Sequence, residues 1–224
     1  MTFSIVGYCR ETKMHGVAIT TSSISVGSRC PWVRAGVGAV TSQNVTDPSI
    51  GNAVLTALEN GLNANEAINQ IMQDRPHAEY RQVAAVDNSG RTAYFTGSKI
   101  LGVNKVAQGE NCIAAGNLLS EPDVPIVMIN KFQSENNIHL AERLLSALEA
   151  GVEAGGEVGP THSAALLVSD TCAWPLVDLR VDWSEQPVSQ LRQCWEVYLP
   201  QMDDYVMRAL DPQSAPAYGV PGDL

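Results

Sequence analysis

Thr2 carries two groups that could do chemistry together, provided that Met1 is removed. The enzyme that trims an initiator Met accepts a small second side chain, and Thr is small enough. Trimming would leave Thr2 with a free α-amine beside its own hydroxyl, which is a recognised pairing of nucleophile and base. An α-amine has a pKa of about 7.7–8.0, so part of it accepts a proton near neutral pH. We therefore interpret Thr2 as a candidate nucleophile, which stays blocked if Met1 is retained.

An ordinary strand residue is the alternative interpretation of Thr2. Thr suits a strand, and the apolar run TFSIVGYC predicts that a strand begins almost at the first residue. The proposed chemistry needs no separate histidine base, because the α-amine of Thr2 itself would serve as the base. The four histidines show no motif, and we expect them on the surface or in packing: His15, His77, His139 and His162.

The cysteines argue against a disulfide framework and a structural zinc site. Their number is odd, they are widely spaced, and no CxxC pair occurs: Cys9, Cys30, Cys112, Cys172 and Cys194. Such cysteines are typical of small buried apolar residues in a reducing compartment. Cys30, close in sequence to Arg34, is an alternative nucleophile, but no histidine lies near it in the sequence.

Composition limits the class of protein. With 224 residues and 45% hydrophobic content, the chain is long enough for one domain with a full core. The net charge of −10 repels phosphate backbones, so nucleic acid is an unexpected partner. No apolar run reaches the ~18–20 residues of a membrane helix, and no signal peptide precedes the first strand. We expect a cytoplasmic protein that acts on a small molecule and needs no metal or organic cofactor. The sequence does not decide whether the protein forms a homo-oligomer.

Hydrophobic periodicity predicts an alternation of strands and helices. The strands are expected at 2–9, 16–23, 35–43, 81–97 as a hairpin, 104–109, 111–117, 163–170 and 175–182. The helices are expected at 47–61, 63–74, 122–135, 138–154 and 187–209. Asp47 is placed to cap the first helix, and Asn63 with Glu66 has the spacing of a capping box in the second.

The strands are apolar on both faces, so both faces need cover. Two stacked, mainly antiparallel sheets with helices outside meet that need. We therefore predict an α+β fold, a four-layer αββα sandwich, with a three-layer α/β fold as second choice. Residues 1–210 form the single expected domain, and the Pro/Gly-rich residues 211–224 an extended or disordered tail.

An ordered set of segments resembles a family of bacterial and archaeal proteins, domain of unknown function 1028 (DUF1028). The set includes MTFSIV, GVAITTSS, PWVRAGVGAVTSQ, DPSIG, RQVAAVDNSGR, AERLLSALEAG, SAALLV and DLRVD, and it covers roughly residues 1–200. That family is grouped with the N-terminal-nucleophile (Ntn) hydrolases, which share the αββα sandwich and mostly cleave amide bonds. The resemblance places Thr2 at the position of the nucleophile.

The resemblance also suggests three partners for Thr2. Arg34 lies where proteasome-type relatives carry a basic residue near the nucleophile, and its cation would favour a neutral α-amine. Gln43 and Asn117 end apolar strands, where amide side chains could donate to a developing oxyanion. Each has a plainer interpretation, Arg34 as a charge at a strand end and Asn117 as half of a Gly-Asn turn. We expect Arg34 and Asn117 in one cleft beside Thr2.

Two further segments offer weaker candidates. Asp178, Arg180 and Asp182 share one strand face and could orient a substrate, although an exposed charge ladder is the preferred interpretation. In GGEVGPTHSAALLV the chain departs from the family, which usually carries a basic, Arg-containing turn there. Gly159, Pro160 and His162 stand in its place, which weakens any substrate role for that loop.

The sequence thus predicts an Ntn-type hydrolase of a small amide or similar C–N bond. Thr2 would attack the carbonyl, its α-amine would move the proton, and Asn117 with backbone N–H groups near Gln43 would hold the oxyanion. The alternative is a non-catalytic binding or assembly protein on the same fold, which never exposes a free Thr2.

Overall fold

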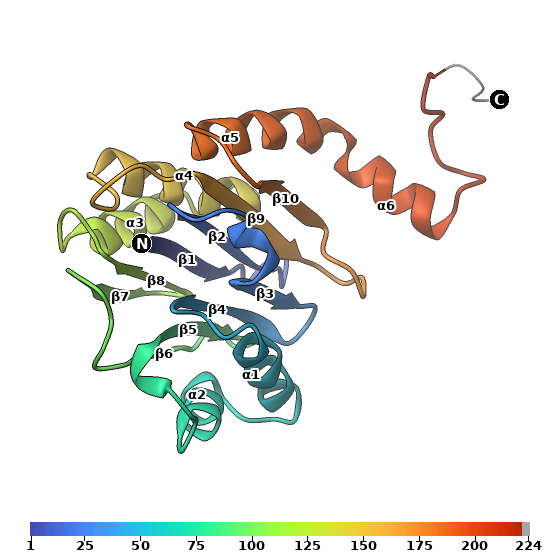
Figure 1. Cartoon of the computed structure of the whole chain (residues 1–224). Coiled ribbons are helices and arrows are strands. Elements are labelled where there is room, and N and C mark those ends of the chain that lie inside the picture. The colour runs from blue at the N-terminus through green and yellow to red at the C-terminus, as the bar shows by residue number, and fades with distance from the viewer. Residues whose placement is uncertain (221–224) are drawn as a thin grey trace.

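In the computed structural model, which describes residues 1–220, two antiparallel sheets lie between two layers of helices (Figure 1). The larger sheet has the order β10-β9-β2-β1-β8-β7 and the smaller one β3-β4-β5-β6. The larger sheet consists of β1 (Thr2–Tyr8), β2 (His15–Thr21), β7 (Lys105–Gly109), β8 (Cys112–Asn117), β9 (Ser163–Ser169) and β10 (Val177–Val181). The smaller sheet consists of β3 (Pro31–Arg34), β4 (Gly38–Asn44), β5 (Arg81–Asp87) and β6 (Thr92–Thr96).

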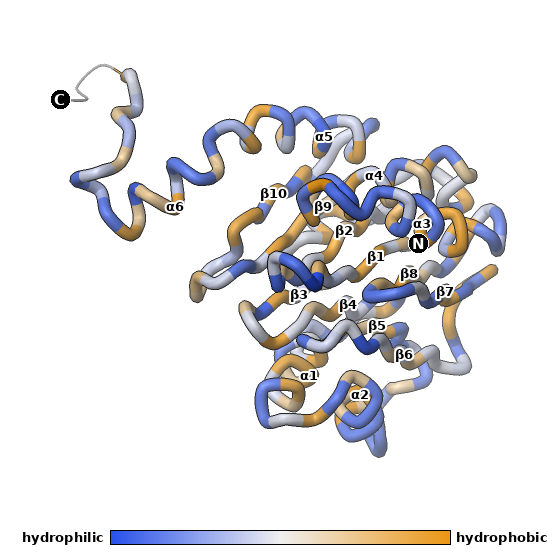
Figure 2. The backbone as a smooth tube through the Cα atoms, turned by 180° about the vertical axis from the view of Figure 1, so that it is seen from behind, coloured by the Kyte–Doolittle hydropathy of each residue, from blue (hydrophilic) through white to orange (hydrophobic). Residues whose placement is uncertain are grey.

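Helices cover the outer face of each sheet. The smaller sheet packs against α1 (Ser49–Glu59) and α2 (Ala64–Met72). The larger one packs against α3 (Val124–Ser134), α4 (Leu140–Glu153) and α5 (Pro187–Tyr198). The predicted four-layer αββα sandwich is therefore confirmed, and the three-layer alternative is wrong. The tube in Figure 2 is hydrophobic along much of β1, β2 and β9, the strands at the centre of the larger sheet.

Three apolar clusters fill the spaces between the layers, as strands with two apolar faces require. On β1, Phe3 and Ile5 face α3 and α4, whereas Val6 faces the smaller sheet. The third cluster lies between the smaller sheet and α1 and α2. Because side chains alternate along a strand, Thr2 and Ser4 share the face of Val6. The hydroxyl of Thr2 therefore points into the layer between the two sheets.

Two elements differ from the sequence prediction. The strand expected at 35–43 is the second half of a hairpin, in which β3 pairs with β4 through a turn at Gly36 with φ of 69°. The helix expected at 187–209 is broken by a 3₁₀ turn, Leu199–Gln201, and continues as α6 (Met202–Leu210), which projects from the body of the fold (Figure 1). Pro200 explains the break because it has no N–H to donate within a helix.

The predicted capping box is confirmed at α2. Oδ1 of Asn63 accepts hydrogen bonds from the N–H groups of Asn65 and Glu66, and the Glu66 carboxylate accepts one from the N–H of Asn63. At α1 the N-cap residue is Pro48, so Asp47 lies one residue earlier than predicted. Its carboxylate still accepts a hydrogen bond from the N–H of Ser49 at 3.0 Å.

In the predicted tail, residues 211–220 form neither helix nor strand, and 221–224 lie outside the described residues.

His15 gives the fold a testable pH dependence. Its ring is 1% exposed and stacks on Tyr8, and burial lowers its pKa to about 4 even though the backbone and the charge of Asp87 oppose that shift. In the unfolded chain this histidine binds a proton below a pKa of about 6.5, so acid favours unfolding between these two pKa values. We expect His15 to account for a loss of about 3 kcal/mol in the free energy of unfolding between pH 7 and pH 4.

Urea unfolding of the wild type and His15→Phe at several pH values measures this contribution. The Phe ring keeps an aromatic contact with Tyr8 and carries no titrating group. We expect the pH dependence of the variant to be shallower between pH 6.5 and pH 4. Identical pH dependence in the two proteins would show that His15 is not buried as a neutral ring.

Candidate active site

The layer between the two sheets changes from apolar to polar towards the end that holds Thr2. Val6, Ile19 and Ala115 belong to its apolar middle. Further along the same strand faces lie buried polar residues: Thr2, Ser4, Thr21, Gln43, Gln82, Asn117 and Ser163. Buried polar side chains are stable only when they are hydrogen-bonded to one another or to the backbone. We call these seven residues the polar cluster.

Thr2 lies in the larger sheet between Thr21 on β2 and Asn117 on β8. Its side chain is buried, with 5% of the residue exposed. The Thr2 hydroxyl donates to the Met1 carbonyl oxygen at 2.5 Å and lies 3.0 Å from the Thr21 hydroxyl, which also donates to that carbonyl. While Met1 is present, its carbonyl therefore occupies both hydroxyls. Removing it would leave the Thr2 hydroxyl beside Thr21 and the new α-amine.

The side chain of Gln82, on β5 of the smaller sheet, links the two sheets through hydrogen bonds to β8. Its Oε1 accepts hydrogen bonds from Nε2 of Gln43 at 2.8 Å and from Nδ2 of Asn117 at 3.2 Å. Its Nε2 donates to the carbonyl of Gly116 at 3.1 Å. The hydroxyl of Ser4 donates to Oε1 of Gln43 at 2.7 Å, which links β1 to the smaller sheet. Buried hydrogen-bond networks of this kind fix the relative positions of the elements that carry them.

The structure thus brings two of the predicted partners, Gln43 and Asn117, to the Thr2 end of the inter-sheet layer. Both amides donate to Gln82, and the buried Oδ1 of Asn117 is the atom left without a hydrogen bond. An amide oxygen is an acceptor and does not stabilise an oxyanion. In this arrangement the two side chains link β4 and β8 to Gln82 on β5, and an oxyanion contact from Asn117 stays a prediction.

Arg34 does not lie beside Thr2, contrary to expectation. It pairs with Gly38 at the start of β4, whereas Gln43 is five residues further along that strand, roughly 17 Å away. Nη1 of Arg34 forms an ion pair with Glu59 at 2.7 Å and lies 3.3 Å from the hydroxyl of Thr56. Both partners belong to α1, on the outer face of the smaller sheet. The sequence prediction was wrong because the β3–β4 hairpin carries Arg34 to the far end of the sheet.

Glu157 is a buried acid at the Thr2 end that the sequence analysis missed. It follows α4, forms a β-bridge with Leu119, and is 5% exposed. Within residues 1–220, neither buried carboxylate oxygen makes a hydrogen bond of good geometry, although the Ser22 backbone is close enough to lower the pKa of the group. Burial raises the pKa of Glu157 well above its ordinary value, while the positive N-terminal amino group lowers it. Glu157 is therefore a buried carboxyl group close to the start of the chain.

The loop after Glu157 borders the polar cluster. The N–H of His162 donates to the carbonyl of Thr21 at 2.8 Å. The His162 ring stacks on Trp183 with centroids 4.4 Å apart, and Trp183 is 56% exposed. A Cβ built on Gly159 would lie 3.7 Å from the Met1 side chain. The segment in which the chain departs from the family pattern is thus next to Met1 and Thr21.

The weaker candidates do not join this cluster. Cys30 is buried in the apolar middle of the inter-sheet layer, and burial raises its pKa to about 11, so its reactive thiolate form is disfavoured. Arg180 forms an exposed ion pair with Asp178 at 2.6 Å, which confirms the charge-ladder interpretation. Three of the histidines stack on aromatic rings, as expected of packing residues: His15, His139 and His162.

Among residues 1–220, no group of three or more His, Cys, Asp or Glu side chains is placed to hold a metal ion. None of the helices in that range is both long enough and apolar enough to cross a membrane.

The model of the family of unknown function DUF1028 matches residues 2–191. The chain belongs to this family. The crystal structure of protein SPO2555 from Silicibacter pomeroyi, of the same family, is 31% identical with a TM-score of 0.84, covering 91% of this chain and 89% of that one. The resemblance stated from the sequence is therefore confirmed. No curated protein matches the chain.

Two Anbu (ancestral beta-subunit) structures are more distant matches to this DUF1028 chain. Anbu from Yersinia bercovieri is 8% identical with a TM-score of 0.38, covering 91% of this chain and 97% of that one. The Anbu (Gly-1) mutant from Hyphomicrobium sp. strain MC1 is 10% identical with a TM-score of 0.44, covering 90% of this chain and 96% of that one.

The DUF1028 match begins at Thr2 and includes Glu157, so it spans the candidate site, and it ends within α5.

Proposed function

We propose that this DUF1028 protein is an N-terminal-nucleophile hydrolase of a small amide or similar C–N bond. The observation that carries the proposal is the place of Thr2 at the polar end of an αββα sandwich, beside a second hydroxyl, with a buried acid near enough to interact with the N-terminal amino group. The sandwich is the fold that the Ntn hydrolases share, and the family resemblance implies that Thr2 takes the position of their nucleophile. Removal of Met1 is the chemical condition for activity.

The reaction would use the two groups of trimmed Thr2. Oγ1 attacks the substrate carbonyl carbon while the α-amine takes the hydroxyl proton. The resulting ammonium gives that proton to the leaving nitrogen as the C–N bond breaks, which leaves an ester on Oγ1. Water, deprotonated by the same amine, then attacks the ester, and the ammonium returns that proton to Oγ1 as the C–O bond breaks and the acid is released. No metal or organic cofactor enters these steps.

In its ionised form, Glu157 would stabilise the ammonium that forms in the first step, and because burial raises its pKa to about 8, that form gains population towards alkaline pH. A carboxylate near an amine favours its protonated form, and little water competes with it at a buried position. Thr21, 3.0 Å from the Thr2 hydroxyl, would orient Oγ1. Backbone N–H groups near Gln43 would hold the oxyanion, and Asn117 would join them only by turning its amide away from Gln82. Arg34 has no part in this proposal.

The intact mass of protein purified from its native source tests the proposal. We expect at least part of the material to lack the mass of one methionine residue, because Thr2 is small enough for trimming. Retention of Met1 in an overproduced sample alone is compatible with the proposal, because trimming saturates. Complete retention in native-source material would contradict it.

One observation favours the non-catalytic alternative, a binding or assembly protein. The Met1 carbonyl fits between the hydroxyls of Thr2 and Thr21 and accepts a hydrogen bond from each. A chain that keeps Met1 therefore satisfies both hydroxyls. The same mass measurement separates the two functions, since the alternative expects Met1 in all of the native-source protein.

A further inference from the structure

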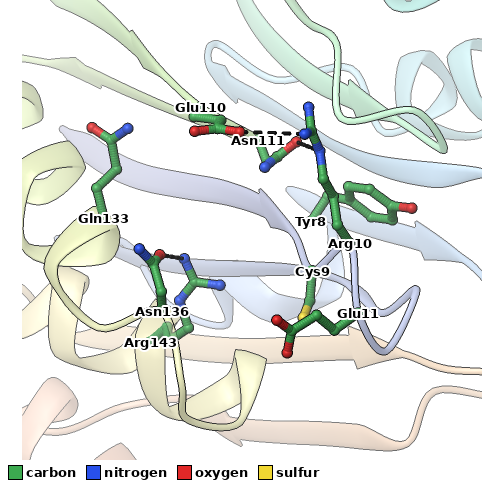
Figure 3. Close-up of a pocket in the computed structure, with 9 residues that line it drawn as sticks. All are labelled: Tyr8, Cys9, Arg10, Glu11, Glu110, Asn111, Gln133, Asn136 and Arg143. Carbon is green, nitrogen blue, oxygen red and sulfur yellow. Dashed lines mark hydrogen bonds and ion pairs between the residues drawn. The ribbon is translucent and has the colours of Figure 1, made fainter.

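A second cavity lies at the opposite end of β1 from Thr2 (Figure 3). It has a volume of about 280 Å³ and is lined by the end of β1 with the residues that follow it (8–11), by the turn between β7 and β8, and by residues of α3, α4 and the loop between these helices. Tyr8, the last residue of β1, is six residues from Thr2, which in a strand is roughly 20 Å. This cavity is therefore separate from the candidate active site.

The deepest charge in this cavity is the guanidinium of Arg143. The residue is 6% exposed and lies over the Phe132 ring, 4.0 Å from its centroid. Its Nε and Nη2 donate to the carbonyl of Phe132, and Nη2 also donates to Oδ1 of Asn136 at 3.0 Å. Within residues 1–220, Nη1 has no hydrogen-bond partner and the cation has no ion pair. In Figure 3 the guanidinium points from Asn136 towards the Cys9–Glu11 segment.

The carboxylates of Glu135 and Glu11 attract this cation from a distance, but no described residue forms an ion pair with it. Arg10 forms an ion pair with Glu110 at 3.4 Å and donates to Oδ1 of Asn111 at 3.1 Å. Glu11 is exposed and forms no ion pair with any described residue. Burial lowers the pKa of Arg143, which shows how poorly its charge is solvated. A buried cation without a counter-ion destabilises the fold unless an anion binds to it.

Cys9 provides a second sign that this cavity favours negative charge. Burial raises the pKa of its thiol, but hydrogen bonds from Thr12 and Glu11, together with the charge of Arg143, outweigh that effect. The net pKa of Cys9 lies below its ordinary value. The buried Cys112, at the start of β8, shows the opposite result, with its pKa raised to about 12 by burial.

We propose that this cavity binds a small monocarboxylate, with the carboxylate on Nη1 of Arg143. A single negative charge neutralises the one unpaired buried cation. Anions of higher charge, such as phosphate, are disfavoured because Glu11 and Glu110 line the same cavity. The amides of Gln133 and Asn136 supply further donors in the lining. The volume lies at or below the lower end of the range for drug-sized ligands, which favours a small molecule.

Titration of the ¹⁵N-labelled protein with sodium propionate, followed by NMR at constant ionic strength, tests this proposal. We expect saturable shifts of the amide signals of residues 9–11, Asn111 and Asn136. Propionamide has the same shape without the charge, and it should cause no saturable shift. Sodium chloride serves as the control for ionic strength. Shifts that do not saturate, or that sodium chloride also produces, would overturn the proposal. If inorganic phosphate binds more tightly than propionate, the assignment of the ligand as a carboxylate is wrong.

Two variants assign the binding to the named charges. Arg143→Gln should weaken propionate binding by about tenfold or more, because it removes a charge-assisted hydrogen bond. Glu11→Gln should tighten binding by roughly twofold to fivefold, because it removes a nearby like charge. Glu11 is exposed, so this variant keeps the test decisive even if Arg143→Gln does not fold. Unchanged propionate affinity in Glu11→Gln, or in a folded Arg143→Gln, would contradict the proposal.

Discussion

Thr2→Ala is expected to reduce hydrolysis of a cleaved amide by about 10³-fold or more, while Thr2→Ser and Thr2→Cys retain part of it. All three replacements are small, so Met1 trimming and the α-amine survive, and only the nucleophilic atom differs. Before a substrate is known, acylation by a β-lactone reagent measures the same step, since opening of the lactone ring leaves an ester on the nucleophile. The acylation rate is obtained by following the fraction of acylated protein over time by intact mass.

The stability of Thr2→Ala separates a chemical effect from unfolding. Loss of one hydroxyl and one methyl group near a terminus should change the free energy of unfolding by about 1 kcal/mol. Thr21→Ala is a matched variant, because it removes the neighbouring hydroxyl and leaves the nucleophile in place. It should slow acylation far less than Thr2→Ala. A folded Thr2→Ala protein that reacts at the wild-type rate would rule out Thr2, and Cys30→Ser would then test whether a thiol reacts instead.

Glu157→Gln is expected to slow acylation by roughly tenfold to hundredfold and to move its pH profile to lower pH. The acylation rate depends on the neutral α-amine of Thr2. A nearby carboxylate favours the ammonium and so raises the pKa of that amine. Removing the negative charge should lower the amine pKa by about one unit, and the neutral form then appears at lower pH. The maximal rate falls because the ammonium formed during attack loses its counter-ion.

Glu153→Gln is the matched control for this experiment. Glu153 is exposed and lies four residues before Glu157, at the end of α4. It should leave both the rate and the pH profile of acylation unchanged. If Glu157→Gln lowers the rate without moving the pH profile, Glu157 acts on packing and not on the amine. If neither quantity changes, Glu157 has no part in the chemistry.

The layers of the fold could be predicted because the strands carry apolar residues on both faces. Runs such as SIVGY and AALLV need cover on each side, and stacked sheets with outer helices give it. The missed features are local. Pro200 ends a helix that the apolar spacing alone continued to residue 209, and the strand expected at 35–43 begins only after a turn at Gly36, before which the short strand β3 was missed.

The candidate site was only partly visible in the sequence. Gln43 and Asn117 could be found because polar residues end apolar strands there, and the same rule applied to β5 would have found Gln82. Arg34 was misplaced because a count along the chain ignores the hairpin that reverses its direction. Glu157 was missed because a Gly-rich loop gives no periodicity from which burial can be read. Its burial follows from the long-range bridge to Leu119, which only the folded structure reveals.

The most direct test is tandem mass spectrometry of the N-terminal peptide of native-source protein after treatment with a β-lactone reagent. This single spectrum reports whether Met1 is present and which atom carries the acyl group. We expect a peptide that begins at Thr2, with the acyl group on the Thr2 side chain. Trimmed protein that reacts only at another residue, or native-source protein that keeps Met1 in every molecule, would contradict the account.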